Sequence, residues 1–285
     1  NRKRASAAIG AEFMPIEQIK ANINIRNDMV DGSSKGINPS VELMYQPAFL
    51  PNFGFSFGYS KNLRFPSMND LFWYPGGNEF LKPEKSLTAE TAINWAPKVD
   101  FGILSLNISG FYSNINDWIL WQPTNFRYWS PENIANVLAR GIEVHQNLNF
   151  VYQKWRIQTT VNYIFTVTTD ESQTAQNENT DGKQLMYIPL HHANGFVKAI
   201  YNMYYTTYNV DYTGVRNTNF DADSYIFSQL PAYWLHHFSI GVQTKSWDIA
   251  LKINNIFNKS YQAVLWRPMP GRNFELLVQY QITKR

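Results

Sequence analysis

The chain has 285 residues, a formal net charge of +3 and no cysteine, and aromatic residues make up 16% of it. The absence of cysteine excludes a disulfide framework and thiolate sites, and the small, scattered charge argues against a nucleic-acid partner. No stretch approaches the roughly 18 consecutive apolar residues of a membrane-spanning helix. The mean hydropathy of −0.36 does not exclude a membrane protein, because a transmembrane barrel alternates apolar and polar residues and averages as polar.

Apolar and small polar residues alternate along most of the chain. Residues 52–60 read NFGFSFGYS, which places Phe53, Phe55, Phe57 and Tyr59 on one face and glycines and serines on the other. This period of two predicts a strand and excludes an amphipathic helix. A half-buried soluble strand would turn the aromatics toward a core, whereas a barrel strand turns them toward lipid. Many repeats run for about ten residues, the length of a tilted membrane-crossing strand, which favours lipid.

The predicted fold class is all-β, a transmembrane up-and-down antiparallel β-barrel. In chain order the predicted strands are 3–13, 18–30, 41–49, 52–62, 87–97, 101–119, 136–150, 154–170, 191–202, 204–216, 233–245, 246–257 and 272–283. Short connections alternate with long ones near 31–40, 63–86, 120–135, 171–190, 217–232 and 258–271. Tight periplasmic turns and long extracellular loops are typical of outer-membrane barrels, so the predicted location is the outer membrane.

The strand count and the charges on the polar face predict further structure outside this chain. An odd number of strands places the two ends of the chain on opposite sides of the membrane, whereas single-chain bacterial barrels have an even number. We therefore expect another chain or segment to supply the remaining strands. Charges of both signs on the predicted inner face, such as Lys20, Arg26, Glu12 and Glu90, favour a plugged lumen over a porin channel.

Three motifs together resemble those of the TonB-dependent outer-membrane receptors. The loop LRFPSMNDLFWYPGGNEFLKPEKSLTAE contains an Arg-x-Pro stretch, a Gly-Asn pair and a Leu-x-Pro-Glu stretch, at Arg64, Pro66, Leu71, Gly77, Asn78, Leu81, Pro83, Glu84 and Ser86. The stretch ARGIEVHQNLNF contributes Gly141 and Glu143, and NNIFNKSYQ with PMPGRNFELLVQY contributes Asn254, Asn255, Phe257, Asn258, Tyr261, Pro270, Gly271 and Arg272. The resemblance covers the whole chain as the C-terminal part of such a barrel.

The resemblance implies a barrel of about 22 strands. Residues 1–285 would supply the C-terminal portion, and the plug domain and first strands are expected outside this chain. It implies import of a scarce large ligand, energised through the inner-membrane TonB complex, with no catalytic residue, metal or cofactor. A surface lipoprotein cap and membrane lipid or lipopolysaccharide are further expected partners. The sequence looks most similar to cobalamin receptors, with haem and ferric-siderophore receptors as alternatives; a passive porin and a soluble propeller adhesin are alternatives from other classes.

Aromatic residues in the predicted loops are the candidate ligand contacts: Phe72, Trp73, Tyr74, Trp121, Tyr128, Trp129, Tyr225 and Trp266. Rigid aromatic surfaces suit a large, flat, partly apolar ligand such as a corrin. The alternative is that these side chains pack the loops together or lie at the membrane interface. The pairs His191–His192 and His236–His237 are not expected to chelate a metal by themselves, because neighbouring residues of a strand point to opposite faces. The resemblance implies a histidine in the loop of the first motif for a haem receptor, and residues 64–86 contain none, which argues against haem.

Overall fold

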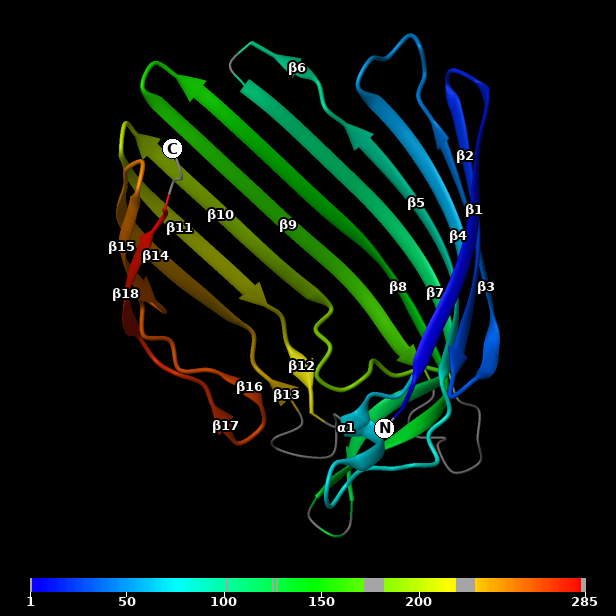
Figure 1. The fold of residues 1–285 in the computed structure, drawn as a ribbon. Coiled ribbons are helices and arrows are strands. Elements are labelled where there is room, and N and C mark those ends of the chain that lie inside the picture. Colours follow the sequence, from blue (N-terminus) through cyan, green and yellow to red (C-terminus); the bar gives the residue numbers. More distant parts are fainter. Residues whose placement is uncertain are drawn as a thin grey trace. The chain divides into compact units, whose positions relative to one another are not determined.

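An antiparallel sheet dominates the computed structural model, which describes residues 2–100, 102–124, 126, 128–171, 182–218 and 229–282. Thirteen strands follow one another in the order β1-β2-β3-β4-β5-β7-β8-β9-β10-β11-β14-β15-β18, with the short β6 beside β7 (Figure 1). Consecutive strands are therefore neighbours, as in an up-and-down barrel. The all-β prediction and the number of long strands are confirmed.

The strand bounds agree with most of the predicted segments. They are β1 (Arg4–Ile16), β2 (Ile19–Val30), β3 (Ser33–Tyr45), β4 (Phe53–Arg64), β5 (Glu84–Trp95), β6 (Lys98–Val99), β7 (Gly102–Pro123), β8 (Trp129–Tyr152), β9 (Trp155–Asp170), β10 (His191–Tyr201), β11 (Tyr204–Thr213), β14 (Tyr233–Gln243), β15 (Trp247–Asn254) and β18 (Asn273–Tyr280). Two small sheets pair β12 (Arg216–Asn217) with β13 (Gln229–Leu230) and β16 (Gln262–Val264) with β17 (Arg267–Pro268). These small sheets lie in predicted long loops and were not expected.

The chain forms two compact units. The first comprises residues 1–92, 109–141 and 167–185, and the second comprises residues 93–108, 142–166 and 186–285. Among the described residues, small clusters of buried apolar side chains lie around Val30, Leu63 and Phe65 in the first unit and around Ile200, Tyr205 and Ala250 in the second.

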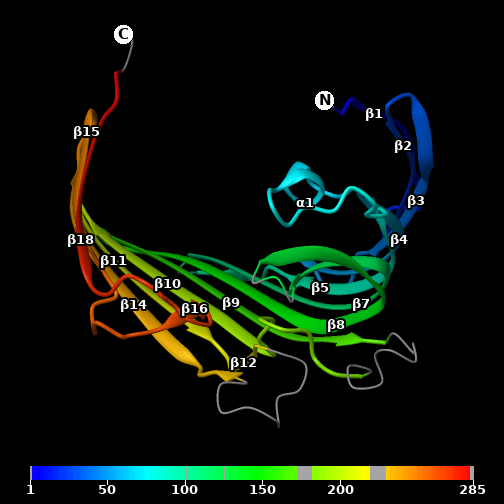
Figure 2. The same ribbon diagram turned by 90° about the horizontal axis from the view of Figure 1, so that it is seen from below.

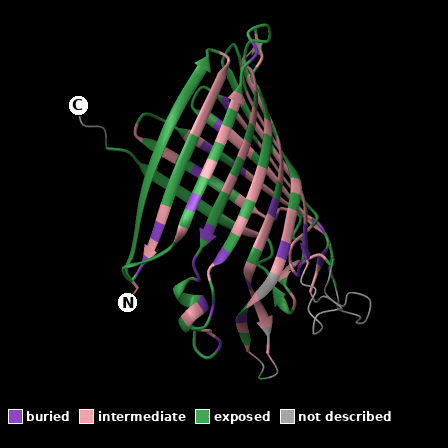
Figure 3. Ribbon diagram, turned by 90° about the vertical axis from the view of Figure 1, so that its right-hand side faces the viewer, coloured by how far each residue is buried: buried purple, intermediate pink, exposed green. Residues whose placement is uncertain are grey.

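The apolar residues of the long strands are exposed rather than packed in a core. Phe55, Leu251 and Val278 are 42%, 47% and 54% exposed, and Figure 3 shows strands coloured mostly as exposed or intermediate. A soluble sheet would bury this face. Apolar side chains that alternate with polar ones and remain uncovered are the arrangement expected where the outer face meets hydrocarbon.

Several of the predicted short connections are tight turns, but the one predicted near Leu50 and Pro51 is longer and spans residues 46–52. Two residues each join β1 to β2, β8 to β9 and β10 to β11, and Gln153 and Asn202 take positive φ values of 54° and 54° in two of these turns. Aromatic pairs flank this end of the second unit, with ring centroids 4.9 Å apart for Trp155 and Tyr201. Tyr and Trp side chains favour the membrane–water interface.

Two of the predicted long loops are wrong. Between β2 and β3 only Asp31 and Gly32 intervene, with φ values of 51° and 77°, the signature of a two-residue type I′ hairpin. Strands β7 and β8 run for 22 and 24 residues, so that only 124–128 remain of the predicted loop 120–135. Both hairpins extend beyond the bilayer, where both faces of a strand meet water. The alternation of apolar and polar residues, which predicts a strand, is absent from these segments.

The described residues contain one helix, α1 (Met68–Phe72), in the loop between β4 and β5. Within the first unit it lies on the concave side of the strands (Figure 2). None of the described residues forms a helix long and apolar enough to cross a membrane.

Candidate ligand-binding site

The loop between β4 and β5 starts with a reciprocal cap on α1. The Ser67 hydroxyl accepts a hydrogen bond from the Asp70 backbone N–H at 3.1 Å, and Asp70 Oδ2 accepts one from the Ser67 N–H at 2.7 Å. This is a capping box with aspartate in place of the usual glutamate. It allows a helix of five residues to form directly after Pro66, which is buried.

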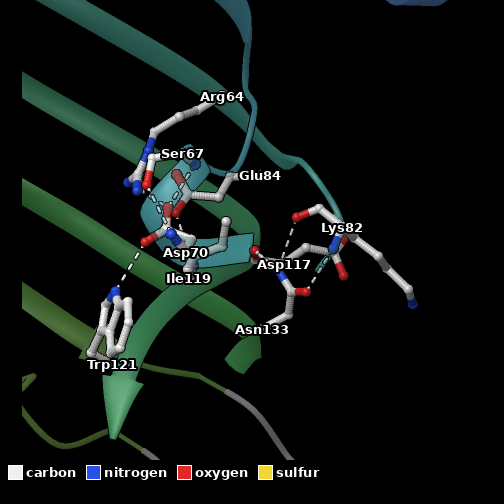
Figure 4. A network of polar contacts seen from close by, with 9 residues as sticks. All are labelled: Arg64, Ser67, Asp70, Lys82, Glu84, Asp117, Ile119, Trp121 and Asn133. Atoms are coloured by element: carbon white, nitrogen blue, oxygen red, sulfur yellow. Dashed lines mark hydrogen bonds and ion pairs between the residues drawn. The ribbon is translucent and has the colours of Figure 1, made fainter. Parts of the chain in front are cut away.

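Asp70 connects α1 to the hairpin of β7 and β8. Its side chain is 7% exposed, and its Oδ1 accepts a hydrogen bond from the Trp121 indole N–H at 2.9 Å (Figure 4). Burial alone would raise the pKa of Asp70. The hydrogen bonds from Ser67 and Trp121 and the positive charge of Arg64 outweigh that effect and hold the pKa below its ordinary value. The carboxylate is therefore ionised at neutral pH.

Arg64 and Glu84 close the base of the loop. Arg64 Nη1 lies 3.0 Å from Glu84 Oε1, and the same oxygen accepts a hydrogen bond from the Ile119 N–H of β7 at 2.8 Å (Figure 4). Glu84 is 5% exposed. The arginine of the Arg-x-Pro stretch and the glutamate of the Leu-x-Pro-Glu stretch thus form one ion pair, and buried carboxylates require such partners.

Two asparagines attach the rest of the loop to the β7–β8 hairpin. Asn133 Oδ1 accepts from the Lys82 N–H at 2.8 Å, and its Nδ2 donates to the carbonyls of Lys82 at 3.1 Å and Asp117 at 2.6 Å (Figure 4). Asn78 Nδ2 donates to the Pro131 carbonyl at 3.1 Å. The loop forms no strand ladder with the hairpin, so side-chain amides supply the hydrogen-bond partners that these backbone N–H and carbonyl groups require.

Two glycines allow close backbone approach, Gly76 between this loop and β8 and Gly77 between this segment and α1. A Cβ atom at Gly76 would lie 1.9 Å from the Trp129 carbonyl oxygen, and one at Gly77 would lie 2.6 Å from the Trp73 nitrogen. Neither distance is physically accessible, so a side chain at either position would displace the loop. Gly77 of the family motif therefore has a steric role.

The scaffold presents several aromatic side chains to solvent. Phe72, Trp73 and Tyr74 are 54%, 58% and 92% exposed. Tyr128 stacks on Phe126 with ring centroids 6.1 Å apart. We call the first unit's predicted contact residues the aromatic platform: Phe72, Trp73, Tyr74, Trp121, Tyr128 and Trp129.

The predicted contact residues differ in their surroundings and in the unit to which they belong. Trp121 is half-buried and its indole N–H donates a hydrogen bond to Asp70, so it links β7 to α1. Trp266 is 68% exposed but belongs to the second unit. Tyr225 lies outside the described residues. Among the described side chains, no group of three or more acidic or histidine residues is arranged to hold a metal.

The remaining motif residues shape loops and strands elsewhere. Leu81 is buried, and Gly141 lies in the middle of β8. Asn255, with a φ of 50°, exchanges hydrogen bonds of 2.8 Å with the backbone of Lys259. The Arg272 N–H donates to Asn258 Oδ1 at 2.9 Å, and a Cβ atom at Gly271 would lie 2.7 Å from that oxygen. These residues fix the connection from β15 to β18, and Asn254 lies on the polar face of β15.

Sequence reasoning did not single out Asp70 or Asn133. The Ser-x-x-Asp spacing ahead of Leu71 was a readable signal for Asp70, because a capping box precedes a helix. Asn133 had no local signal, since its partner Lys82 is 51 residues away.

The uncovered apolar alternation, the nearest-neighbour strand order and the large loop assembly at one end define an outer-membrane type of β-barrel segment. Residues 2–256 match the family model described as "TonB dependent receptor-like, beta-barrel", and the chain belongs to that family.

Known relatives and solved structures agree with this assignment. The chain is 25% identical over 273 residues to the Vitamin B12 transporter BtuB of Vibrio vulnificus strain YJ016, covering 92% of this chain and 40% of that protein. Its fold matches the copper transporter OprC with a TM-score of 0.72 and 15% identity, covering 98% of this chain and 48% of that one. It also matches the ferric-catecholate import receptor Fiu from E. coli K12 with a TM-score of 0.71 and 18% identity, covering 98% and 45%. The chain therefore spans less than half the length of each of these proteins.

Proposed function

We propose that this chain is the C-terminal barrel portion of an outer-membrane receptor that imports a corrinoid, energised by the TonB complex. The observation that carries the proposal is the similarity to a vitamin B12 transporter over 92% of the chain. The solved structures are too distant in sequence to indicate a ligand. Ferric-siderophore or haem import by the same kind of receptor is the alternative that binding measurements must exclude.

The aromatic platform supports this ligand class. Trp73 and its neighbours are exposed, yet their backbone is held by the Asp70, Glu84 and Asn133 contacts. A rigid aromatic surface loses little conformational entropy when it binds a broad, partly apolar ring system. Corrin is such a ring system.

The partners follow from the sheet and the family. Among the described strands, β1 and β18 end the strand order, and all 13 residues of β1 are exposed. Unpaired strand edges attract further strands, so we propose that the remaining barrel strands pair there. A plug domain, a surface lipoprotein cap and lipopolysaccharide against the apolar face complete the proposed assembly.

Equilibrium binding to the full-length receptor tests the proposal. We expect cyanocobalamin to bind and to resist competition by haem or a ferric catecholate. Trp73→Ala should weaken cobalamin affinity about tenfold, equivalent to about 1.4 kcal/mol for one aromatic contact. Phe49→Ala, which removes an aromatic side chain 83% exposed in the turn after β3, is the matched control and should bind as wild type.

Two outcomes contradict the proposal. Wild-type receptor that binds a ferric catecholate or haem but not cobalamin would assign it to the alternative ligand class. A steady open conductance in a planar bilayer, with no saturable binding, would identify a passive porin. Trp121→Ala is not a clean probe, because it also removes a partner of Asp70.

A further inference from the structure

A row of asparagines crosses the polar face of the second unit. Six strands contribute one residue each, namely Asn147, Asn162, Asn194, Asn209, Asn254 and Asn273 of β8, β9, β10, β11, β15 and β18. We call this row the amide belt. On β14, which lies between β11 and β15, His237 occupies the corresponding position.

Hydrogen bonds and strand register make the belt continuous from β8 to β11. His145 bonds through one ring nitrogen to Asn147 at 2.6 Å and through the other to Asn162. Asn162 is paired in register with Asn194, and Asn194 Nδ2 donates to Asp211 Oδ1 at 2.5 Å. The other oxygen of Asp211 accepts from Asn209 Nδ2 at 3.3 Å.

The same pattern continues to β18. His237 is paired in register with Asn209, and its Nδ1 lies 3.1 Å from Asn254 Oδ1. Asn254 Nδ2 donates to Asn273 Oδ1 at 2.8 Å and to Glu275 Oε1 at 2.5 Å. The belt is therefore a polar track across seven adjacent strands, joined by hydrogen bonds on most strands and by register alone between Asn162 and Asn194.

A depression of about 300 Å³ lies on this track, lined among others by Phe196, Thr207, Asn209, His237 and Asn254. Phe238 and Lys252 complete the lining, so the depression combines two aromatic rings with amide and hydroxyl groups, an imidazole and one ammonium group. The volume is at the lower end for ligand sites, so it suits one part of a large molecule rather than the whole.

The chemistry of the belt selects for neutral, amide-bearing ligands. A primary carboxamide both donates and accepts, so a row of them matches other carboxamides without requiring a charge. The charged groups nearby have partners within the sheet. Lys252 Nζ lies 3.9 Å from Glu275 Oε2, and Asp211 Oδ2 lies 3.5 Å from His237 Nε2. Lys198, which is paired in register with Thr207, has its Nζ 4.4 Å from the centre of the Tyr205 ring. Two carboxylates and two ammonium groups leave no excess of positive charge to hold an anion, for which arginine or lysine clusters are the usual receptors.

We propose that the amide belt and its depression form a binding subsite on the barrel wall for the carboxamide-bearing edge of a neutral ligand during its passage. The proposal rests on the proposed corrinoid function, because corrinoids carry carboxamide side chains around an apolar ring. The Phe196 ring contacts the apolar part, and Asn209 and Asn254 replace hydrogen bonds to lumen water or to the plug domain with hydrogen bonds to the ligand amides. In this family's barrel the polar face is the inner face.

Cysteine protection tests the subsite directly, because the chain has no cysteine of its own. Full-length receptor carrying Thr207→Cys, reconstituted with the TonB complex, is treated with a hydrophilic thiol reagent. We expect cyanocobalamin under energised conditions to slow labelling about fivefold, and expect no slowing with an uncoupler or without cobalamin. Asn107→Cys is the matched control, since Asn107 pairs with Asn94 on the same unit outside the belt.

Uptake by Asn209→Leu provides a second measurement. We expect cobalamin uptake to fall about fivefold, as for one lost hydrogen bond, while surface affinity remains that of wild type and Asn107→Leu imports normally. Folding of each variant is checked by its heat-modifiable electrophoretic mobility. If wild type binds and imports cobalamin normally but cobalamin does not slow the labelling of Thr207→Cys, the subsite is contradicted and the proposed function is not. Absence of cobalamin binding by wild type overturns the proposed function.

Discussion

Replacing Asp70 by alanine should release α1 and the aromatic platform without unfolding the barrel. The change removes the acceptor of the Ser67 N–H at 2.7 Å and of the Trp121 indole at 2.9 Å. Hydrogen bonds to an ionised group contribute about 1.5 kcal/mol each at the lower end of the measured range. Together they give about 3 kcal/mol, so the open population of the loop should rise about 100-fold.

Hydrogen–deuterium exchange of the full-length receptor measures that opening. The Leu71 and Trp73 amides, which donate to carbonyls of the same turn, should exchange about 100-fold faster in Asp70→Ala, while amides of β10 and β11 keep wild-type protection. Glu79→Ala removes an exposed carboxylate from the same loop and should change nothing. Wild-type protection of the α1 amides in Asp70→Ala would show that these contacts do not hold the loop.

Three further predictions concern the same loop. Asn133→Ala should make the loop cleavable by protease in intact vesicles, because three backbone contacts are lost; resistance equal to wild type would contradict this. Gly76→Ala should lower cobalamin affinity by at least tenfold, since its Cβ would meet the Trp129 carbonyl, whereas Gly54→Ala, whose Cβ has no neighbour nearer than 3.7 Å, should not. The pKa of Asp70 is lowered by folding, so its stabilisation is complete above the ordinary aspartate pKa of about 3.9 and is lost as the pH falls through the lower native value. Protection of the α1 amides, corrected for intrinsic exchange, should therefore be constant from pH 7 to about pH 5 and fall only in stronger acid; a decline already near pH 6 would refute the assignment.

The membrane-crossing part of the fold was readable from the sequence because lipid on one side imposes a period of two. Phe55 and Leu251 are exposed on the faces where the alternation placed them. Beyond the bilayer that constraint disappears, and the pattern no longer separated strand from loop. The Asp31–Gly32 pair was a local signal for a tight hairpin, but it occurred where the apolar alternation had already ended.

The site was less predictable because its contacts join distant residues. The motif positions Arg64 and Glu84 were identified, but their ion pair depends on the course of the loop between them. Asn133 reaches Lys82 across 51 residues. The amide belt is an intermediate case, because alternation placed Asn162 and Asn254 on the polar face. Only the register between strands brings the asparagines into one row, and a slip of one residue would remove them from it.

The β7–β8 hairpin has a mechanical consequence. Its 24-residue strand has a contour length of about 80 Å at 3.3 Å per residue, while about ten residues suffice to cross the bilayer. More than half of the strand therefore extends beyond the hydrocarbon. The hydrogen bonds between β7 and β8 make this extension stiffer than an irregular loop. We therefore expect an epitope inserted between β7 and β8 to be held away from the membrane and to be accessible to an antibody.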